Sequence, residues 1–191
     1  MKEQFSTPAL IIIRGIPGSG KTSIAIGLAE ALGNNKVQRI DPDEIDVTSD
    51  AYRAFSRSLS AQGIDEKFHT YRYLNTKARQ AVDAHQVIIW NQAFIDFKGL
   101  SITIERLREY AHGQGIELSV LVVDVVIDPV AARQRISTRA AQDGRVIDEE
   151  VMERFIQNYA HLDGKLYPSI IVHGTDPIQQ SVTSIIGSLK T

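Results

Sequence analysis

The stretch of sequence that decides the fold is Gly15-Ile16-Pro17-Gly18-Ser19-Gly20-Lys21-Thr22. It matches the pattern G-x-x-x-x-G-K-[ST] at every fixed position. Residues 9–13 before it form a short apolar run rich in β-branched side chains, which predicts a buried strand. Residues 20–32 after it predict a helix, and Gly33 is a typical stop. A glycine-rich turn between a strand and a helix is typical of a loop that binds phosphate through backbone N–H groups.

Each part of this phosphate loop has a predicted role in binding ATP and Mg²⁺. Glycines let the backbone curl so that successive N–H groups point at phosphate oxygens, and the following helix adds the positive end of its dipole. Lys21 is expected to reach the β- and γ-phosphates, and the Thr22 hydroxyl is expected to ligate Mg²⁺. The predicted nucleotide contacts are Gly15, Pro17, Gly18, Ser19, Gly20, Lys21, Thr22 and Ser23.

Several classes of nucleotide-binding protein share such a loop, and other segments separate them. A GTPase needs an Asn-Lys-x-Asp motif to read the base, and the nearest match, Asn35-Lys36-Val37-Gln38, lacks the final Asp. Oligomeric ATPases usually need a longer chain and an apolar strand that ends in Asp-Glu. Asp43-Glu44 does not follow such a strand. These differences favour a kinase.

The rest of the chain alternates short apolar runs with longer amphipathic stretches, the rhythm of a parallel sheet covered by helices. The expected strands are residues 9–13, 37–40, 87–90, 118–127 (interrupted at Asp124) and 169–172. The expected helices are residues 20–32, 65–85, 101–111 and 178–189, with further helix starts at Asp128-Pro129 and Asp148. Right-handed crossovers place helices on both faces of the sheet. We therefore predict one α/β domain over residues 1–191, a three-layer P-loop kinase fold with a five-stranded parallel sheet and a helical lid.

The composition limits where the protein works and what it binds. The 191 residues carry a net charge of −2, which creates no overall field that would attract nucleic acid or an anionic membrane. The chain has no cysteine, which excludes disulfides, zinc thiolate sites and cysteine nucleophiles, and a reducing cytoplasm is the expected location. The longest apolar runs are too short for a signal peptide or a membrane span. We expect no membrane partner, and a nucleic-acid partner is disfavoured.

An acidic cluster, Asp41-Pro42-Asp43-Glu44, follows the second predicted strand. In open α/β sheets the ligand crevice lies beyond the carboxyl ends of the strands, so these carboxylates are expected to face it. A carboxylate there accepts the proton of an acceptor hydroxyl and aligns the hydroxyl with the γ-phosphate. Asp43 and Asp41 are both candidate catalytic residues. The alternative is that one of them caps the turn that begins at Pro42, and both roles can coexist.

Polar residues after the third and fourth strands are the other candidate site residues. Asn91 follows the third strand and either orients a magnesium-bound water, touches the substrate, or is a polar strand end beside a buried Trp. Arg135 and Arg139 are four residues apart and share one face of a helix, from which a closing lid at about residues 133–147 would neutralise phosphoryl charge. A solvated basic face is the alternative. Asp124 is a magnesium-side carboxylate or, as we favour, a structural residue.

Residues 46–85 are rich in basic and aromatic side chains and are where a small kinase places its acceptor-binding helices. The segment could hold an anionic or nucleotide-like acceptor. The more frequent meaning of such a pattern is an amphipathic helix pair that buries its aromatic side chains. The five histidines show no metal-ligand spacing.

The phosphate loop, the acidic cluster and the arginine pair occur in the order found in one group of enzymes. The chain resembles the small P-loop kinases related to the polynucleotide kinase domain, zeta toxins and chloramphenicol phosphotransferase, over about residues 8–189. The resemblance implies that Asp43 is the base and that Arg135, Arg139 and Arg145 are lid arginines. The group often carries an Asp where this chain has Trp90-Asn91, so the carboxylate that assists Mg²⁺ stays open. The resemblance implies a reaction class and not a substrate.

The sequence thus predicts an ATP-dependent phosphotransferase that moves the γ-phosphate to a hydroxyl of a small-molecule or nucleotide acceptor. Two alternatives stay open, a zeta-type toxin kinase controlled by an antitoxin and a non-catalytic ATP-binding regulatory module. The presence of Lys21, Thr22 and Asp43 together favours catalysis over the regulatory module. Neither the acceptor nor the oligomeric state follows from the sequence.

Overall fold

A five-stranded parallel sheet forms the centre of the protein in the computed structural model. The structure describes residues 8–189 except 145 and 161–165. The strands lie in the order β2-β3-β1-β4-β5. Their bounds are Ala9–Arg14 (β1), Val37–Ile40 (β2), Val87–Asn91 (β3), Ser119–Val126 (β4) and Ser169–His173 (β5). The predicted strands are confirmed, but the interruption expected at Asp124 is wrong, because β4 runs through this residue. Because the strands are parallel, their carboxyl ends meet at one edge of the sheet, and the candidate site residues gather there.

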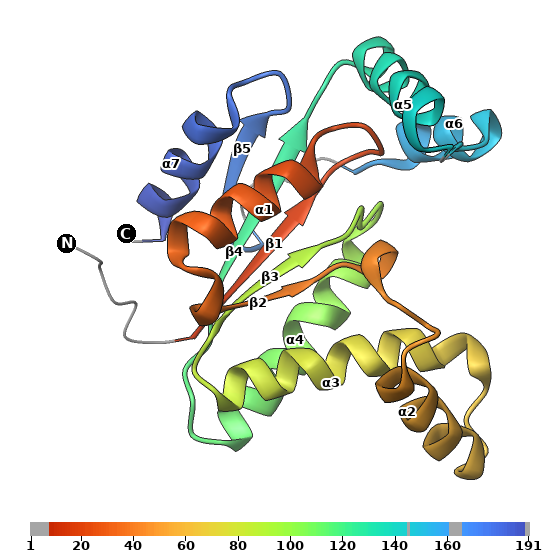
Figure 1. Cartoon of the computed structure of the whole chain (residues 1–191). Helices are drawn as coiled ribbons and strands as arrows, with labels where there is room; N and C mark the ends of the chain where they lie inside the picture. Colours follow the sequence, from red (N-terminus) through yellow and green to blue (C-terminus); the bar gives the residue numbers. More distant parts are fainter. Residues whose placement is uncertain (1–7, 145, 161–165, 190–191) are drawn as a thin grey trace.

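Helices connect the strands and cover both faces of the sheet (Figure 1). Their bounds are Lys21–Leu32 (α1), Asp50–Ala61 (α2), His69–Asp83 (α3), Phe97–Gly113 (α4), Pro129–Asp143 (α5), Glu149–Asn158 (α6) and Ile178–Ser188 (α7). Short 3-10 turns occupy Asn34–Lys36, Pro42–Glu44 and Glu66–Phe68. The predicted three-layer α/β fold is therefore confirmed.

Alternating strand residues build two cores. Leu10 and Ile12 of β1 face α3 and α4, in a core that also holds the buried Trp90. Ile11 and Ile13 face the opposite side, where α1 and α7 pack together. Successive side chains of a strand point to opposite faces, and a parallel sheet covered on both faces therefore needs a continuous apolar run. This explains why residues 9–13 carry no polar side chain.

Helices α5 and α6 lie beyond the carboxyl ends of β1 and β4 (Figure 1). They share a small core with the phosphate loop, formed by Ile16, Ala132, Ile136 and Met152. Asp128 begins α5 by accepting hydrogen bonds from two backbone N–H groups, as the Asp-Pro pair predicts. The region expected to form the lid therefore stands over the phosphate loop.

Residues 50–83 form a helical hairpin, in which α3 corresponds to the helix expected over residues 65–85. Helix α3 begins only at His69, whose buried ring lies between the Ser56 hydroxyl (2.8 Å) and the Ile64 carbonyl (2.9 Å) and ties α3 to α2. Tyr52 and Tyr73 pack edge to face across the two helices, with ring centroids 5.2 Å apart. Tyr52, Phe55 and Tyr73 are thus partly buried between the two helices, as the amphipathic interpretation predicts, whereas Phe68 stays exposed.

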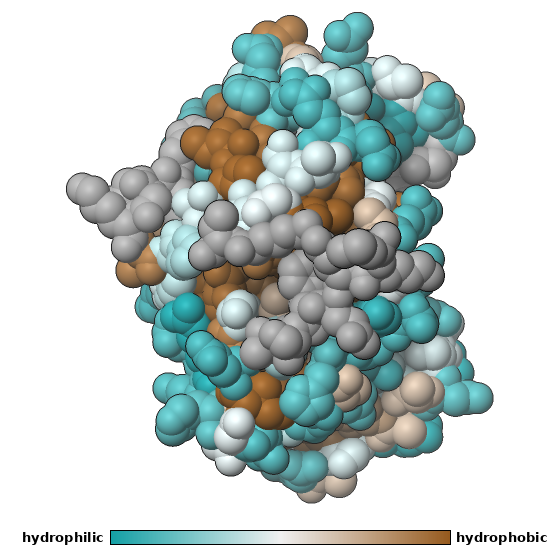
Figure 2. Space-filling view, turned by 90° about the vertical axis from the view of Figure 1, so that its left-hand side faces the viewer, coloured by the Kyte–Doolittle hydropathy of each residue, from teal (hydrophilic) through white to brown (hydrophobic). Residues whose placement is uncertain are grey.

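The face of the molecule on the α7 side mixes hydrophobic and hydrophilic areas (Figure 2). Large hydrophobic side chains that stay exposed include Ile171 of β5 and Ile178 of α7. Within the described part of the chain, every helix is too short or too polar to cross a membrane.

Candidate active site

The phosphate loop leaves the start of α1 open to an anion. Gly18 and Gly20 have φ angles of 80° and 99°, which favour glycine and turn the chain tightly into the helix. Gly20 occupies the N-cap position, and no side chain caps the helix there, in contrast to α5 with its Asp128 cap. The Ser19 hydroxyl is buried and has no hydrogen-bond partner among the described residues. Uncapped N–H groups and a buried unpaired hydroxyl fit a bound phosphate chain.

Lys21 lies at the centre of this loop. Its ammonium group donates to the Ile16 carbonyl at 2.9 Å, so the side chain folds back over the loop. Burial lowers the pKa of Lys21 to about 8, although the nearby carboxylates of Asp41 and Asp43 oppose this shift. The positive charge of Arg139 lowers the same pKa further. The charges of Asp41 and Asp43, which follow β2, and of Arg139 on α5 therefore all act on the lysine.

Asp41, Asn91 and Thr22 form a connected polar group beside the loop. The Asn91 amide donates to the Thr22 hydroxyl at 3.0 Å and also to the Asp41 carboxylate. Ile40 and Trp90 are partners in the sheet register, so the next residues, Asp41 and Asn91, leave neighbouring strands on the same face. Burial raises the pKa of Asp41, opposed by its hydrogen bonds. A carboxylate and an amide thus lie beside the Thr22 hydroxyl at the carboxyl ends of β2 and β3.

Asp41 and Asp43 have different environments. The Asp41 carboxylate accepts the Asp43 backbone N–H at 2.9 Å and so caps the short turn Pro42–Glu44. The Asp43 side chain is exposed and makes no hydrogen bond or ion pair among the described residues. Of the two, Asp43 has the carboxylate that is available to accept a proton from a bound hydroxyl.

The predicted lid arginines lie against the phosphate loop. Arg135 Nη1 donates to the Gly18 carbonyl at 3.4 Å. Arg139 is one turn further along α5 and acts on the charge of Lys21. Of the two arginines, Arg135 therefore contacts the phosphate loop directly, whereas Arg139 influences Lys21 through its charge. Arg145 lies outside the described residues.

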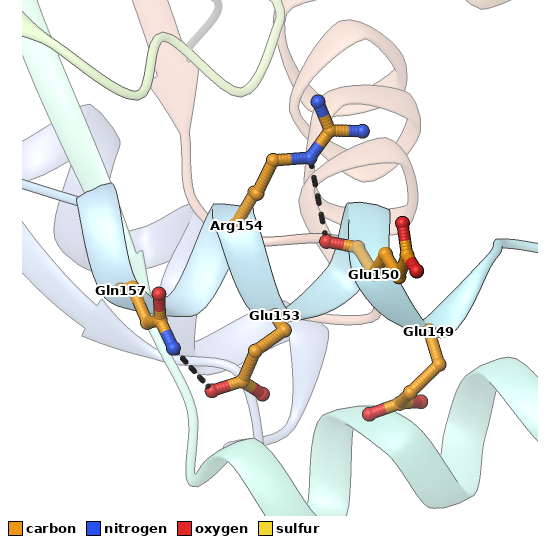
Figure 3. A pocket seen from close by; sticks show the side chains of 5 residues that line it. All are labelled: Glu149, Glu150, Glu153, Arg154 and Gln157. Carbon is orange, nitrogen blue, oxygen red and sulfur yellow. Dashed lines mark hydrogen bonds between the residues drawn. The ribbon is translucent and has the colours of Figure 1, made fainter.

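Arg133 and Arg154 belong to other surfaces of the same two helices. Arg133 holds α5 to α6 through Glu149 (2.9 Å) and Glu153 (2.6 Å). Figure 3 shows Glu149 and Glu153 pointing toward α5, whereas Arg154 projects from the opposite side of α6. Arg154 lines a cavity of about 580 Å³ between α6 and Ile95 and Asp96 of the loop after β3. No sequence motif marks Arg154.

Another group that sequence reasoning missed lies beneath the loop. Arg14 and Asp124 are both buried, are partners in the sheet register, and approach to 3.8 Å between Nη1 and Oδ2. The Tyr159 hydroxyl donates to the Asp124 carboxylate. This confirms the structural role favoured for Asp124. An arginine that ends a buried apolar strand was the available signal for the group.

These residues fit a bound magnesium–nucleotide complex. Mg²⁺ is usually held by one or two protein oxygens together with phosphate oxygens and waters. The Thr22 hydroxyl beside Asp41 and Asn91 supplies such a set, whereas the described residues contain no group of three His, Asp or Glu side chains able to enclose a metal. Bound with ATP, the ion would neutralise charge on the phosphates.

A family model for an AAA domain, AAA_33, matches residues 10–162, which include the phosphate loop, the acidic cluster, both lid arginines and α6. The chain belongs to this AAA domain family. The match covers most of the chain and every candidate site residue described above. No curated protein matches the chain.

Solved structures similar to this AAA domain include kinases and a nucleotide-bound protein. An unliganded sugar kinase from Janibacter sp. is 18% identical, with a TM-score of 0.62 over 96% of this chain and 95% of that chain. A gluconokinase from Sinorhizobium meliloti is 16% identical, with a TM-score of 0.57 over 96% and 92%. Kti12 from Chaetomium thermophilum, in complex with ADP-AlF3, is 18% identical, with a TM-score of 0.59 over 94% and 98%. The fold of the chain is that of the P-loop kinases.

Proposed function

We propose that this AAA domain is an ATP-dependent phosphotransferase that moves the γ-phosphate of Mg-ATP to a hydroxyl of a small-molecule or nucleotide acceptor. The observation that carries the proposal is the phosphate loop with its uncapped helix start and Lys21, beside which Asn91 contacts Thr22 and Arg135 contacts Gly18. A non-catalytic ATP-binding module needs the loop but has no use for an exposed carboxylate beside it. The kinase fold of the similar structures supports the same reaction class.

Each residue has a defined part in the proposed reaction. The phosphate loop and Lys21 bind the phosphates, and Thr22 with Asp41 and Asn91 faces the magnesium side. Asp43 accepts the proton of the acceptor hydroxyl as the oxygen attacks phosphorus. Arg135 and Arg139 neutralise charge that develops on the transferred group. Phosphoryl transfer depends mainly on positioning and charge stabilisation, so this set is sufficient.

A transfer screen tests the proposal. The protein is incubated with γ-labelled ATP, Mg²⁺ and pools of nucleosides, sugars, antibiotics and 5′-hydroxyl oligonucleotides, and labelled products are separated. Transfer to at least one pool is expected, and the Lys21→Ala variant should lose it. The opposite result is that the wild-type protein binds ATP tightly but transfers no label to any pool, so that the wild-type protein and Lys21→Ala do not differ in transfer. This result would favour a regulatory module instead.

A further inference from the structure

Arg14 is a fully buried charge at the end of β1, directly before the first glycine of the phosphate loop. Burying an arginine is costly unless its charge is paired and its N–H groups are hydrogen-bonded. Asp124 supplies the opposite charge from the neighbouring strand at 3.8 Å. The Tyr159 hydroxyl donates to the same carboxylate, and the Tyr159 ring lies 4.3 Å from the guanidinium carbon. The chain therefore maintains a charged group where an apolar side chain would pack more simply.

The guanidinium joins two segments that are distant in the sequence. Arg14 Nη2 donates to the Phe94 carbonyl at 2.9 Å and to the Ala160 carbonyl at 2.7 Å. Phe94 belongs to the loop after β3, and Ala160 lies two residues after the end of α6. The same two segments also meet directly, because the Ala160 N–H donates to the Ile95 carbonyl at 3.0 Å. Arg14 thus fixes the end of α6 to the loop after β3.

The loop that Arg14 holds has an unusual backbone. Phe94 has a φ angle of 42°, a left-handed conformation that is uncommon for a bulky aromatic residue. Such conformations persist only where the surroundings hold them, and they concentrate at functional sites. The Arg14 hydrogen bond to the Phe94 carbonyl supplies one such restraint.

The two segments are also the walls of one cavity. The 580 Å³ cavity is bounded on one side by Ile95 and Asp96, directly after Phe94, and on the other by the α6 face that carries Val151, Arg154, Phe155 and Asn158. Its lining combines apolar side chains with a carboxylate, a guanidinium and an amide, a composition suited to a small polar organic molecule. The separation of the two walls depends on the contact between the end of α6 and the loop after β3. Arg14 holds this contact through its hydrogen bonds to the Phe94 and Ala160 carbonyls.

We propose that the cavity between α6 and the loop after β3 binds the phosphoryl acceptor, and that Arg14 is a positioning residue for this acceptor because it joins the two walls of the cavity. The proposal rests on the proposed phosphotransferase function. Arg14 touches neither ATP nor the acceptor in this scheme. It connects the strand that leads into the phosphate loop with the acceptor cavity, so that the hydroxyl and the γ-phosphate keep one relative position.

The test uses Arg14→Lys, which keeps the positive charge beside Asp124 but has no planar fork to reach both carbonyls. A matched control is Arg106→Lys on the exposed side of α4, an arginine that also lies near an aromatic ring. Hydrogen exchange of residues 92–97 and 150–160 is measured with Mg-ADP bound, and acceptor KM, ATP KM and kcat are measured with any acceptor found. We expect exchange in both segments to rise about tenfold in Arg14→Lys, and the acceptor KM to rise similarly, with ATP KM and the control unchanged.

The outcomes separate this proposal from a purely structural role. If exchange in both segments stays at the wild-type rate, or if it rises throughout the chain together with loss of nucleotide binding, the proposal is wrong. If Arg14→Lys fails to fold, Tyr159→Phe replaces it. This variant keeps the ring over Arg14 but removes the hydrogen bond from the Tyr159 hydroxyl to Asp124. Faster exchange is then expected at residues 157–160. The exchange measurement needs no acceptor. If the wild-type protein shows no transfer, that result counts against the proposed function. The hydrogen-exchange rates still decide whether Arg14 joins the two segments.

Discussion

The ammonium group of Lys21 is partly buried, and charges of both signs act on it. Burial is the largest influence and lowers its pKa to about 8, with Asp41 and Asp43 opposing the shift and Arg139 adding to it. A lysine with this pKa loses its charge within the pH range in which a protein can be studied. The phosphates of a nucleotide favour the charged form, so bound nucleotide must raise the pKa again.

Proton uptake on binding should therefore depend on pH. At pH 7 most of the free protein already carries charged Lys21, and Mg-ATP binding takes up little proton. At pH 9 most of it is neutral, so binding takes up close to one proton, and affinity falls by up to about tenfold per pH unit above pH 8. Calorimetry in two buffers of different ionisation enthalpy measures the uptake. The Lys21→Arg variant stays charged at pH 7 and at pH 9 and should take up no proton at either pH. Zero proton uptake by the wild-type protein at pH 9 would show that Lys21 is already charged in the free protein.

The Asp43 carboxylate is predicted to act as the general base. Asp43→Asn keeps the size of the side chain but removes proton acceptance, so nucleotide affinity should stay within about twofold and turnover should fall by roughly 10²- to 10⁴-fold. Turnover is measured with an acceptor from the screen. Glu44→Gln is the matched control, because the Glu44 carboxylate is engaged with Arg39 at 2.6 Å. Near-normal turnover in Asp43→Asn combined with a loss in Asp41→Asn would move the role to Asp41.

The sequence predicts some of these residues and not others for a physical reason. The phosphate loop is contiguous, so spacing alone reveals Lys21 and Thr22. Which of Asp41 and Asp43 serves as the cap depends on the local backbone, and the structure gives that role to Asp41. The pairing of Arg14 with Asp124 depends on the register between β1 and β4, which no local pattern encodes.

At the scale of elements, apolar runs and helix caps predicted most of the architecture. All five strands and the capped start of α5 at Asp128 follow from the sequence. The boundary between α2 and α3 does not follow from the sequence. The turn near Ile64 depends on His69, whose ring hydrogen-bonds to the Ser56 hydroxyl across the hairpin and to the Ile64 carbonyl. Tertiary contacts of this kind decide where a helix begins when the amphipathic pattern continues on both sides.

Helix α5 is the element for which we predict ligand-dependent motion. Its arginines face the phosphate loop, and Arg133 ties it to α6 through partly exposed ion pairs that are individually weak. Exchange over residues 134–146 should slow by about tenfold or more when Mg-ADP and aluminium fluoride, a mimic of the transferring phosphoryl group, are added. Helix α7 serves as the internal control and should not change. Equal protection of residues 134–146 with and without the mimic would mean that this segment is not a lid.

At the scale of the whole molecule, distant segments approach two glycines of the phosphate loop so closely that they leave no space for a Cβ atom. A Cβ atom on Gly15 would lie 2.6 Å from the Val125 carbonyl oxygen of β4. One on Gly18 would lie 2.6 Å from the Ala132 carbonyl oxygen of α5. One on Gly174, in the turn after β5, would lie 2.1 Å from the Ser19 carbonyl oxygen. The conformation of the loop is thus fixed by β4, α5 and the C-terminal part of the sheet together.

Gly174→Ala should therefore damage nucleotide binding although residue 174 lies outside the motif. The added methyl group cannot coexist with the Ser19 carbonyl, so the loop or the turn after β5 must shift, at a cost of about 1–3 kcal/mol in the free energy of unfolding. We expect the melting temperature to fall by several degrees and Mg-ADP affinity to fall by at least about tenfold. Gly187→Ala near the end of α7 is the matched control, because nothing lies within 4 Å of the added atom. That variant should be neutral or slightly stabilised, since alanine favours a helix more than glycine does. A Gly174→Ala protein with unchanged melting temperature and affinity would mean that the turn after β5 does not constrain the phosphate loop.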